Sequence, residues 1–528
     1  MQGIMVVGTT SHAGKSLLTS AICRILSRKG WRVAPFKGQN MALNAYVTAD
    51  GGEMGHAQAV QAWAAKITPR VAMNPILLKP QGDMTSQVIM RGKVVGKTTA
   101  KEYYEQYFER GWLTIRQCLS ELAQDFDLLV CEGAGSPAEI NLKHRDLTNM
   151  RVAMYLNAPT ILVVDIDRGG AFAHVVGTLQ LLEPEERSLI KGIVINKFRG
   201  QKSLLDSGIS WLEAYTNIPV IGVIPWLDQV FPAEDSLDLF ERRSRHDQRD
   251  IKIAVIRLPR IANFTDFEPL ETEATVALKY VNLNESLGHP DAVILPGSKT
   301  TISDLIALHN SGMAAQIQAY VNNGGTVMGI CGGFQMLGQK VTDPDQIEGE
   351  EVEYLGLNLL PVKTTLSDKK IARQRQVLSN FPQTFPIEGY EIHQGRTEVI
   401  ISLELTPPNP PLVRGGKSNS NNPLTQGKKG EQEAFLPLFD DPELGLVNSC
   451  QSLWGCYLHG LFDNGKFRRA WLNILREKKG LSALNTEVSN YHQQREIMFD
   501  FLADFIEQYL DLKPILHDFS LETINKKV

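Results

Sequence analysis

The sequence predicts an α/β protein with two doubly wound domains and a helical C-terminal segment. Short apolar runs rich in β-branched residues alternate with helix-length segments, which is typical of a parallel sheet covered by helices. This alternation occurs twice, before and after a charged, irregular stretch. The end of the chain lacks such runs and has helical periodicity.

The first series of apolar runs predicts the sheet of the first domain. Each run ends at or directly before Gly, Asp, Lys or Pro and is followed by a segment long enough for a helix. The runs are IMVVG (4–8), RVAPF (32–36), DLLVCEG (127–133), TILVVDID (160–167), GIVINK (192–197) and PVIGVIP (219–225). We therefore expect a first domain over residues 1–226.

Residues 227–250 are charged and irregular and are expected to be a linker. A second series of strands follows, in IKIAVIRLP (251–259), DAVILPGS (291–298) and GTVMGIC (325–331). This series predicts a second α/β domain over residues 251–467, before a helical segment at 468–528.

Two further stretches predict local structure, one a disordered insertion and the other a helix. Residues 406–434 are rich in Pro, Gly, Ser and Asn and contain few large apolar side chains, so we expect a disordered insertion. In the C-terminal segment, Ile497, Phe501, Phe505 and Tyr509 recur at i, i+4 spacing. This stripe predicts the packing face of a helix.

Composition excludes several classes of protein. The 528 residues are 43% apolar and 21% charged, with a net charge of −5, so nothing global indicates nucleic acid or an acidic membrane as partner. The six cysteines show neither a disulfide framework nor paired metal-ligand spacing, which favours reduced thiols in the cytoplasm. The start, MQGIMVVG, lacks a basic signal-peptide region, and no apolar run is long enough to cross a membrane.

The first predicted strand leads directly into GTTSHAGKS (8–16) and then into a helical pattern. Such loops bind phosphates because their backbone N–H groups and the helix N-terminus point at the anion. Lys15 is expected to reach the β- and γ-phosphates, and Ser16 to help hold Mg²⁺. The candidate ATP-binding residues are Gly8, Thr9, Gly14, Lys15 and Ser16.

The spacing of this loop is one residue longer than the usual phosphate-binding pattern. This longer form resembles the dethiobiotin synthetase-like ATPases. In that group, carboxylates at the ends of neighbouring strands hold Mg²⁺. The resemblance implies Glu132, at the end of LLVCEGAG, and Asp50 as further metal ligands.

A single cysteine lies between glycines in GICGG (329–333), where a predicted strand gives way to a helical pattern. This spacing is typical of a sharp elbow that exposes a nucleophile, and glycine permits backbone angles that a side chain would strain. The helix N-terminus favours the thiolate of Cys331, and the N–H of Gly332 is expected in an oxyanion hole. His459, which ends the run WGCYLH, is the candidate base.

Together these features resemble the class I glutamine amidotransferases, in which the cysteine attacks the glutamine carboxamide to give a glutamyl thioester and ammonia. The resemblance implies that Gln335 and the loop at Gly297 hold glutamine and its oxyanion. Most members carry a glutamate two residues after the histidine, where this chain has Leu461. The third member of the triad is therefore absent or comes from elsewhere, and the orientation of His459 is unexplained.

The order of the two domains and several motifs resemble the cobyric acid synthase family, in which the triad glutamate is also normally absent. The matching stretches are KGQNMALN (37–44), NPILLKP (74–80), EGAGSPAEINL (132–142), DIDRGGAFAH (165–174), INKFRG (195–200) and GYEIHQGRT (389–397). The resemblance implies glutamine, ATP with Mg²⁺ and a corrinoid polycarboxylate as substrates and cofactors. The reaction implied is amidation of the b, d, e and g carboxylates of adenosylcobyrinic acid a,c-diamide through acyl phosphates.

Polar residues near the ends of the predicted strands are candidates for corrinoid contacts, with ordinary surface roles as the alternative. They are Lys37, Gln39, Asn40, Asn44, Asp146 and Arg168. His393, in GYEIHQG, is a candidate for orienting the glutaminase site, for contacting the corrin or for a structural hydrogen bond.

Two other functions fit parts of the sequence. One is a ligase of the cobyrinic acid a,c-diamide synthase type, which has the same two domains; EGAGSPAEINL and DIDRGG favour the first assignment. The other is a nucleotide-switched binding protein with an inactive glutaminase domain, related to the partitioning ATPases. Those ATPases usually carry a second lysine early in the loop, where this chain has Thr9–Thr10–Ser11.

Overall fold

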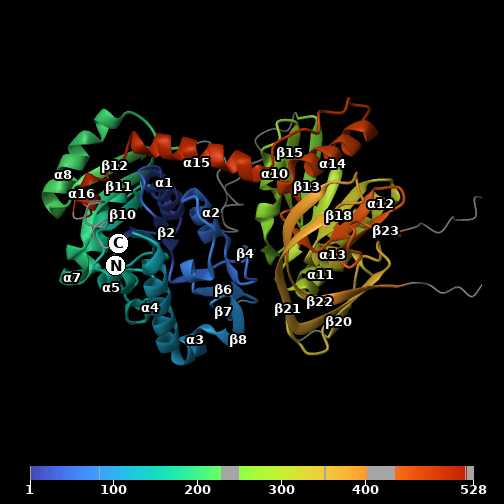
Figure 1. Cartoon of the computed structure of the whole chain (residues 1–528), viewed down its shortest axis with the longest axis horizontal. Coiled ribbons are helices and arrows are strands. Elements are labelled where there is room, and N and C mark those ends of the chain that lie inside the picture. The colour runs from blue at the N-terminus through green and yellow to red at the C-terminus, as the bar shows by residue number, and fades with distance from the viewer. Residues whose placement is uncertain are drawn as a thin grey trace, which may run out of the picture.

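The structure is a computed structural model that describes residues 2–82, 84–227, 249–349, 352–400, 435–517 and 519. The described chain forms two α/β domains that lie side by side, with one C-terminal helix running across both (Figure 1). Most of the expected linker, 227–250, and all of the expected insertion, 406–434, lie outside the described residues.

A six-stranded parallel sheet forms the centre of the first domain, in the order β12-β11-β10-β1-β9-β2. Each of the six predicted runs forms one of its strands, which confirms the expected doubly wound sheet. Because β9 and β10 flank β1, their carboxyl ends lie on either side of the loop that follows β1. The strands are β1 (Gly3–Gly8), β2 (Val33–Phe36), β9 (Leu128–Glu132), β10 (Thr160–Asp165), β11 (Ile190–Phe198) and β12 (Val220–Pro225).

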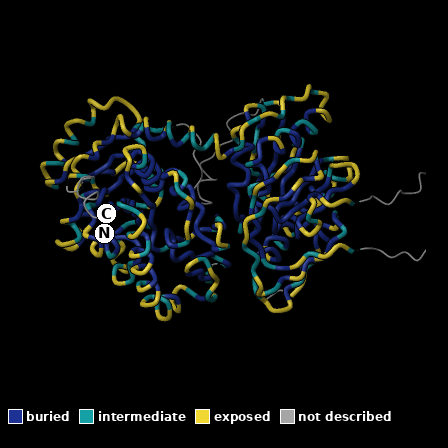
Figure 2. Tube along the Cα trace, in the orientation of Figure 1, coloured by how far each residue is buried: buried dark blue, intermediate teal, exposed yellow. Residues whose placement is uncertain are grey.

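Helices cover both faces of this sheet, so its strands are buried on both sides (Figure 2). Alternate residues of β1 show this directly, because Ile4 and Val6 belong to one core cluster whereas Met5 and Val7 belong to another. The helices are α1 (Lys15–Arg28), α2 (His56–Ala64), α3 (Ala100–Gln106), α4 (Phe108–Asp125), α5 (Met150–Leu156), α6 (Ala171–Leu181), α7 (Pro184–Ser188) and α8 (Asp206–Thr216), with 3₁₀ turns η1 (Val71–Met73), η2 (Lys143–Arg145) and η3 (Lys202–Leu204).

A small sheet and a hairpin, both inserted after β2, face the second domain (Figure 1). The sequence analysis did not predict either of them. The sheet has the order β3-β6-β7-β8, and its strands are β3 (Gln39–Met41), β6 (Ile76–Pro80), β7 (Thr85–Met90) and β8 (Lys93–Thr99). The hairpin consists of β4 (Ala45–Val47) and β5 (Glu53–Gly55).

The second domain is built on a seven-stranded sheet in the order β15-β13-β16-β18-β25-β24-β23. The three predicted strands of this domain form β13, β16 and β18, and they lie next to one another in parallel. The other edge is antiparallel, so the sheet is mixed. The strands are β13 (Ile251–Arg257), β15 (Val276–Asn282), β16 (Ala292–Leu295), β18 (Thr326–Ile330), β23 (Phe435–Pro437), β24 (Gly445–Asn448) and β25 (Leu453–Cys456).

A second sheet, with the order β20-β19-β21-β22-β26, lies on the side toward the first domain and contains a long hairpin. Its strands are β19 (Lys340–Thr342), β20 (Glu353–Leu355), β21 (Val362–Leu378), β22 (Pro386–Val399) and β26 (Leu458–His459), and a separate short pair is β14 (Ile261–Ala262) with β17 (Gly297–Ser298). The helices are α10 (Glu268–Glu271), α11 (Thr301–Asn310), α12 (Met313–Asn322), α13 (Gly332–Leu337) and α14 (Gly465–Lys478), with 3₁₀ turns η4 (Phe264–Phe267) and η5 (Leu461–Asp463).

The C-terminal helices α15 (Tyr491–Glu507) and α16 (Lys513–Leu516) return to the first domain, where α15 packs on α1 (Figure 1). The fully buried Arg24 of α1 fixes this contact through ion pairs with Glu496 and Asp500. The predicted packing stripe is wrong for Ile497, Phe501 and Tyr509, which are 72%, 40% and 39% exposed, whereas Phe505 packs against the core. The buried face of α15 is instead formed by Phe499, Leu502, Ala503 and Ile506.

Candidate functional site

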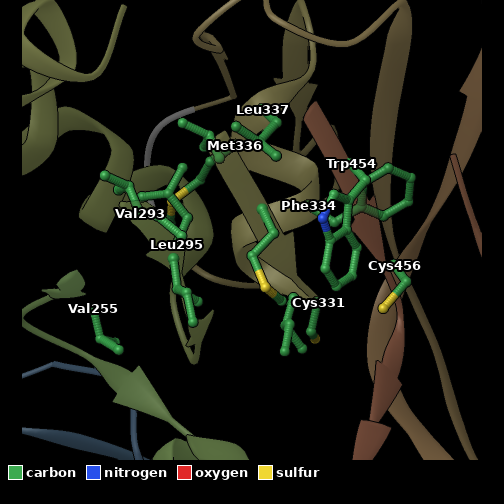
Figure 3. Close-up of a cluster of buried hydrophobic side chains, with 14 of the residues drawn as sticks. Val255, Val293, Leu295, Cys331, Phe334, Met336, Leu337, Trp454 and Cys456 are labelled. Atoms are coloured by element: carbon green, nitrogen blue, oxygen red, sulfur yellow. The ribbon is translucent and has the colours of Figure 1, made fainter. Parts of the chain in front are cut away.

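Cys331 lies at the junction between β18 and α13, at the carboxyl edge of the main sheet of the second domain. Its backbone has a φ of 53° and a ψ of −109°, which a residue with a side chain rarely adopts. Figure 3 shows the side chain next to the buried cluster that contains Leu295 and Phe334. Such strain at a strand-to-helix turn is a feature of nucleophile elbows.

The glycines around Cys331 are required for close packing. A Cβ at Gly333 would lie 2.0 Å from the carbonyl oxygen of Leu295, and one at Gly329 would lie 2.5 Å from the backbone of Gly333. A Cβ at Gly332 would lie 2.8 Å from the backbone nitrogen of Ser298. The sequence analysis expected these glycines to permit unusual backbone angles, but the positive φ belongs to Cys331 itself. The glycines are needed instead because neighbouring backbone atoms approach them too closely for a side chain.

His459, on β26, has an acidic partner that the sequence analysis missed. Its Nδ1 atom lies 2.7 Å from Oδ2 of Asp266 in η4, and Oδ1 of the same carboxylate accepts the N–H of Gly460 at 2.9 Å. Both side chains of the pair are buried. Because Asp266 occupies Nδ1, the other ring nitrogen, which has no hydrogen-bond partner among the described groups, is left for Cys331 in the same pocket. The three residues form a cysteine–histidine–aspartate arrangement.

The charge of Asp266 controls the protonation of His459. Burial alone would lower the pKa of His459, but the carboxylate of Asp266, helped by the sulfur of Cys331, outweighs burial and raises the pKa to about 10. The imidazole is therefore held in its protonated form at neutral pH. An imidazolium beside the sulfur stabilises a thiolate.

The loop opposite Cys331 is held by buried hydrogen bonds. Gly297 pairs with Ala262 in the short β14–β17 pair, and a Cβ on it would approach the His459 ring to 3.4 Å. The hydroxyl of the next residue, Ser298, donates to Asp304 at 2.7 Å. The backbones of this loop and of Gly332 are thus close together, as an oxyanion hole requires.

Cys331, His459 and the Gly297 loop line one pocket, and Gln335 lines it as well. The side-chain amide of Gln335 is bound to protein groups. It accepts from the hydroxyl of Thr301 at 3.0 Å and donates to the carbonyl of Gln394 and to the hydroxyl of Tyr457. Its expected contact with glutamine remains a prediction.

His393 also lines the pocket and is held by protein groups. Its Nε2 lies 3.2 Å from Glu391, and its ring stacks on Tyr457 with centroids 3.7 Å apart. Burial lowers the pKa of His393 against the opposing effect of Glu391. These contacts fit a structural role that also shapes the glutaminase pocket.

Lysines that the sequence analysis did not single out surround the pocket at Cys331. Lys79 comes from the first domain, whereas Lys299 and Lys370 come from the second, so both domains line the pocket. The buried Glu53 of the first domain bonds Lys79 at 2.8 Å and also pairs with Lys370. Burial, together with the charges of the other two lysines, lowers the pKa of Lys299 to about 7.

The phosphate-binding loop has the predicted strand before it and the predicted helix after it. Gly14 caps α1 with a φ of 94°, and a Cβ there would lie 2.1 Å from the side chain of Asn196. The ammonium group of Lys15 bonds the carbonyls of Thr10 and Gly135 and so lies across the loop. The loop begins at Gly8, and the backbone of Thr9 is fixed to β10.

Glu132 and Ser16 form a pair of oxygen donors beside this loop. The hydroxyl of Ser16 bonds Oε1 of Glu132 at 2.8 Å, and the ammonium group of Lys37 bonds the same oxygen at 2.7 Å. Burial alone would raise the pKa of Glu132, but Lys37 outweighs it and lowers the pKa. Because a cation already contacts this carboxylate, the pair fits Mg²⁺, which prefers hard oxygen ligands.

Asp50 is not supported as a metal ligand by its position. It is exposed in the turn between β4 and β5, where it accepts the hydroxyl of Thr48, and this hairpin faces β21 of the second domain. The carboxylate at the end of the other neighbour of β1 is Asp165, which pairs with Lys197 at 3.0 Å. The sequence analysis missed Asp165 as an acid at the edge of the sheet.

The candidate corrinoid contacts near β2 all have protein partners. Gln39 accepts from Tyr103, and Asn40 donates to Gln58. Asn44 accepts the backbone N–H of Phe264 in the second domain.

The two remaining candidates lie elsewhere on the first domain. Asp146 lies just before α5 and accepts the N–H groups of Thr148, Asn149 and Arg151. Arg168 is largely exposed and lies 3.8 Å from Asp165.

None of the helices in the described part of the chain combines the length and the apolar character of a bilayer-crossing segment.

Family comparisons agree with both halves of this geometry. Residues 4–239 match the CobQ/CobB/MinD/ParA nucleotide binding domain, and residues 252–467 match the CobB/CobQ-like glutamine amidotransferase domain. The first match contains the phosphate-binding loop, and the second contains Cys331, His459 and Asp266.

Full-length relatives are similar over nearly the whole chain. The cobyric acid synthase of Nostoc sp. strain PCC 7120 is 66% identical over 517 residues, which cover 98% of this chain and 99% of the relative. That of Trichormus variabilis is 66% identical over 97% of this chain and 99% of the relative, and that of Nostoc punctiforme is 66% identical over 98% and 100%. The chain therefore belongs to the cobyric acid synthase family of glutamine amidotransferase ligases.

Proposed function

We propose that this chain transfers the amide nitrogen of glutamine to the b, d, e and g carboxylates of adenosylcobyrinic acid a,c-diamide, with one ATP consumed for each amide. The observation that carries this proposal is the Cys331–His459–Asp266 arrangement in a chain that also holds Ser16 and Glu132 beside a phosphate-binding loop. A carboxylate must be activated before ammonia can replace one of its oxygens, so both sites are needed.

In the second domain, the thiolate of Cys331 attacks the side-chain carboxamide carbon of glutamine. The N–H groups of Gly332 and of the Gly297 loop stabilise the oxyanion that forms. The C–N bond then breaks while His459 gives its proton to the nitrogen, which releases ammonia and leaves a glutamyl thioester on Cys331. Water, deprotonated by His459, hydrolyses the thioester to glutamate and restores the thiolate beside the protonated His459.

In the first domain, an oxygen of the corrinoid carboxylate attacks the γ-phosphorus of ATP, and ADP leaves. Ammonia then attacks the carbonyl carbon of the acyl phosphate, which loses phosphate and a proton to give the amide. Lys15, which lies across the loop, would hold the phosphates. Mg²⁺ held by Ser16 and Glu132 would neutralise charge on the phosphates.

Lys37 has a defined place in this scheme because it already shares Glu132 with Ser16. With Ser16 and Glu132 holding Mg²⁺, the ammonium group of Lys37 would be free to bind an anionic group. The corrinoid substrate presents several carboxylates, so Lys37 is the residue of the KGQNMALN stretch best suited to bind one of them. Gln39, Asn40, Asn44, Asp146 and Arg168 remain candidates for the other contacts.

The test is to incubate the purified protein with the a,c-diamide, Mg²⁺-ATP and glutamine and to measure the product by mass spectrometry. The proposal predicts four added amides and ADP. An a,c-diamide synthase would leave this substrate unchanged and would amidate cobyrinic acid twice instead. A nucleotide-switched binding protein would release no ammonia from glutamine.

A further inference from the structure

A short segment of the first domain, Asn44–Val47, makes buried contacts with the parts of the second domain that hold His459. The N–H of Ala45 donates to Oδ1 of Asn263 at 3.0 Å, and the carbonyl of Ala45 accepts the hydroxyl of Tyr390 at 3.2 Å. In addition, Oδ1 of Asn44 accepts the N–H of Phe264 at 3.2 Å. One peptide segment thus bonds two separate elements of the neighbouring domain.

The first of these elements carries the acid of the triad. Asn263 has a φ of 52°, and its carbonyl accepts the N–H of Asp266 at 3.1 Å, which forms a tight turn. Asp266 in turn fixes Nδ1 of His459. The contacts of Asn44 and Ala45 therefore set the position of the turn from which the carboxylate projects.

The second element touches the histidine ring itself. Tyr390 stacks on His459, with ring centroids 5.4 Å apart and planes inclined by 21°, and the two residues are register partners in β22 and β26. The ring of Tyr46, also in the segment, packs against Tyr390 at 5.6 Å. The tyrosine hydroxyl is buried and bonds Ala45, so the first domain contacts His459 from a second direction through this ring.

At its other end the segment continues into the synthetase site. It begins at the last residue of the stretch 37–44, whose first residue, Lys37, bonds Glu132, the partner of Ser16. Between these ends β3 is paired with β6, and Asn40 is bonded to Gln58, so the stretch is an ordered connection. Lys37 and Ala45 therefore lie on the same short run of chain. A movement of Lys37 away from Glu132 would shift the run that carries Ala45.

We propose that Asn44–Val47 is a positioning element that aligns His459 and transmits occupation of the synthetase site to the glutaminase. Asn263 and Tyr390 are its positioning residues in the second domain. The inference rests on the proposed function, since it assigns Mg²⁺-ATP and the corrinoid to the first domain. Its consequence is that glutamine hydrolysis is slow until those ligands bind, which limits the loss of ammonia.

Two variants remove the contacts singly. Asn263→Gly deletes the acceptor of the Ala45 N–H and suits the positive φ, whereas Tyr390→Phe deletes only the hydroxyl and keeps the ring on His459. Gln374→Ala is the matched control. It removes another bond to the same segment, from Gln374 to the carbonyl of Val47. Gln374 is the register partner of Tyr390, so this control leaves the strand pairing beside His459 in place and changes a bond that reaches neither Asn263 nor the Tyr390 hydroxyl.

The measurements are the kcat and KM of glutaminase, with and without Mg²⁺-ATP and the a,c-diamide, and the rate of amidation from ammonium chloride. For Asn263→Gly and Tyr390→Phe we expect the stimulated kcat to fall about tenfold to a hundredfold, as for a slightly misplaced catalytic group. The KM for glutamine and the ammonia-dependent rate are expected to stay close to wild type, which also reports a folded protein. Gln374→Ala is expected to retain the stimulation.

Wild-type stimulation in both positioning variants would overturn the inference, as would an equal loss in Gln374→Ala. If the wild-type protein fails to amidate the corrinoid even with ammonia, the proposed function is wrong. The basal glutaminase kcat of the variants still tests the alignment of His459 in that case, so the two failures are distinguishable.

Discussion

The carboxylate of Asp266 lies 2.7 Å from Nδ1 of His459, although the two residues are 193 positions apart in the chain. This contact supplies the acid that Leu461 cannot provide and explains the orientation of the imidazole. Because both side chains are buried, the pair is shielded from solvent, and the charge of Asp266 acts strongly on the ring.

Asp266→Asn should lower glutaminase kcat by about 10²- to 10⁴-fold, as expected when the acid that orients a catalytic histidine is lost. In the wild-type protein Asp266 raises the pKa of His459 to about 10 against the effect of burial. Without that charge burial prevails, so the imidazolium form is lost at a lower pH. The alkaline limb of the pH–rate profile should therefore move to lower pH.

The control for this variant is Asp463→Asn, which removes a partly exposed acid of η5 that pairs with Arg495 at 3.7 Å rather than with His459. Burial raises the pKa of Asp463, and the neighbouring Arg495 opposes this effect. An unchanged pH profile in Asp266→Asn, or an equal shift in Asp463→Asn, would contradict the assignment of Asp266.

Glu132→Gln should abolish amidation from both glutamine and ammonium chloride while leaving basal glutamine hydrolysis measurable. The amide cannot supply the negative oxygen that bonds Ser16 and Lys37 in the wild-type protein. Ser16→Ala should be milder and raise the Mg²⁺ concentration needed for half-maximal rate. Magnesium titrations at fixed ATP measure this, and an unchanged requirement in both variants would rule out the proposed metal site. Asp50→Asn is the matched comparison and should need the same Mg²⁺ concentration for half-maximal rate as the wild-type protein.

The buried ion group at the domain interface predicts a sensitivity to acid. Burial alone would raise the pKa of Glu53, but Lys370 and Lys79 outweigh it and lower the pKa to about 2. A carboxylate whose folded pKa lies below its unfolded value stabilises the protein above the unfolded pKa, near 4.5, and this stabilisation is lost as the pH falls toward 2.

Glu53→Gln should lower the free energy of unfolding at pH 7 by about 3–5 kcal/mol, since it leaves two buried ammonium groups without their partner. The variant should also lose part of the dependence of stability on pH between 4.5 and 2. Urea denaturation at several pH values measures both effects. The same slope in variant and wild type would show that Glu53 is not the titrating group.

Local patterns in the sequence predicted the strands, the phosphate-binding loop and the elbow at Cys331, because each depends on residues that are adjacent in the chain. Asp266 and Lys79 could not be found in this way, since only the folded chain brings them to the pocket at Cys331. Asp266 does follow the first strand of its domain closely, and that position was the one available signal. The prediction that the stripe at Ile497 packs against the protein was wrong for a related reason. Both faces of α15 are apolar, and the ion pairs of Arg24 with α15 fix which face packs on α1.

The most direct test of the account follows the nitrogen itself. Glutamine labelled with ¹⁵N in its side-chain amide is supplied with Mg²⁺-ATP and the a,c-diamide, and the corrinoid product is analysed by mass spectrometry. The wild-type protein should place ¹⁵N in every new amide, whereas Cys331→Ala should form none from glutamine yet amidate normally from ¹⁵N-ammonium chloride. Labelled amides made from glutamine by Cys331→Ala would contradict the account.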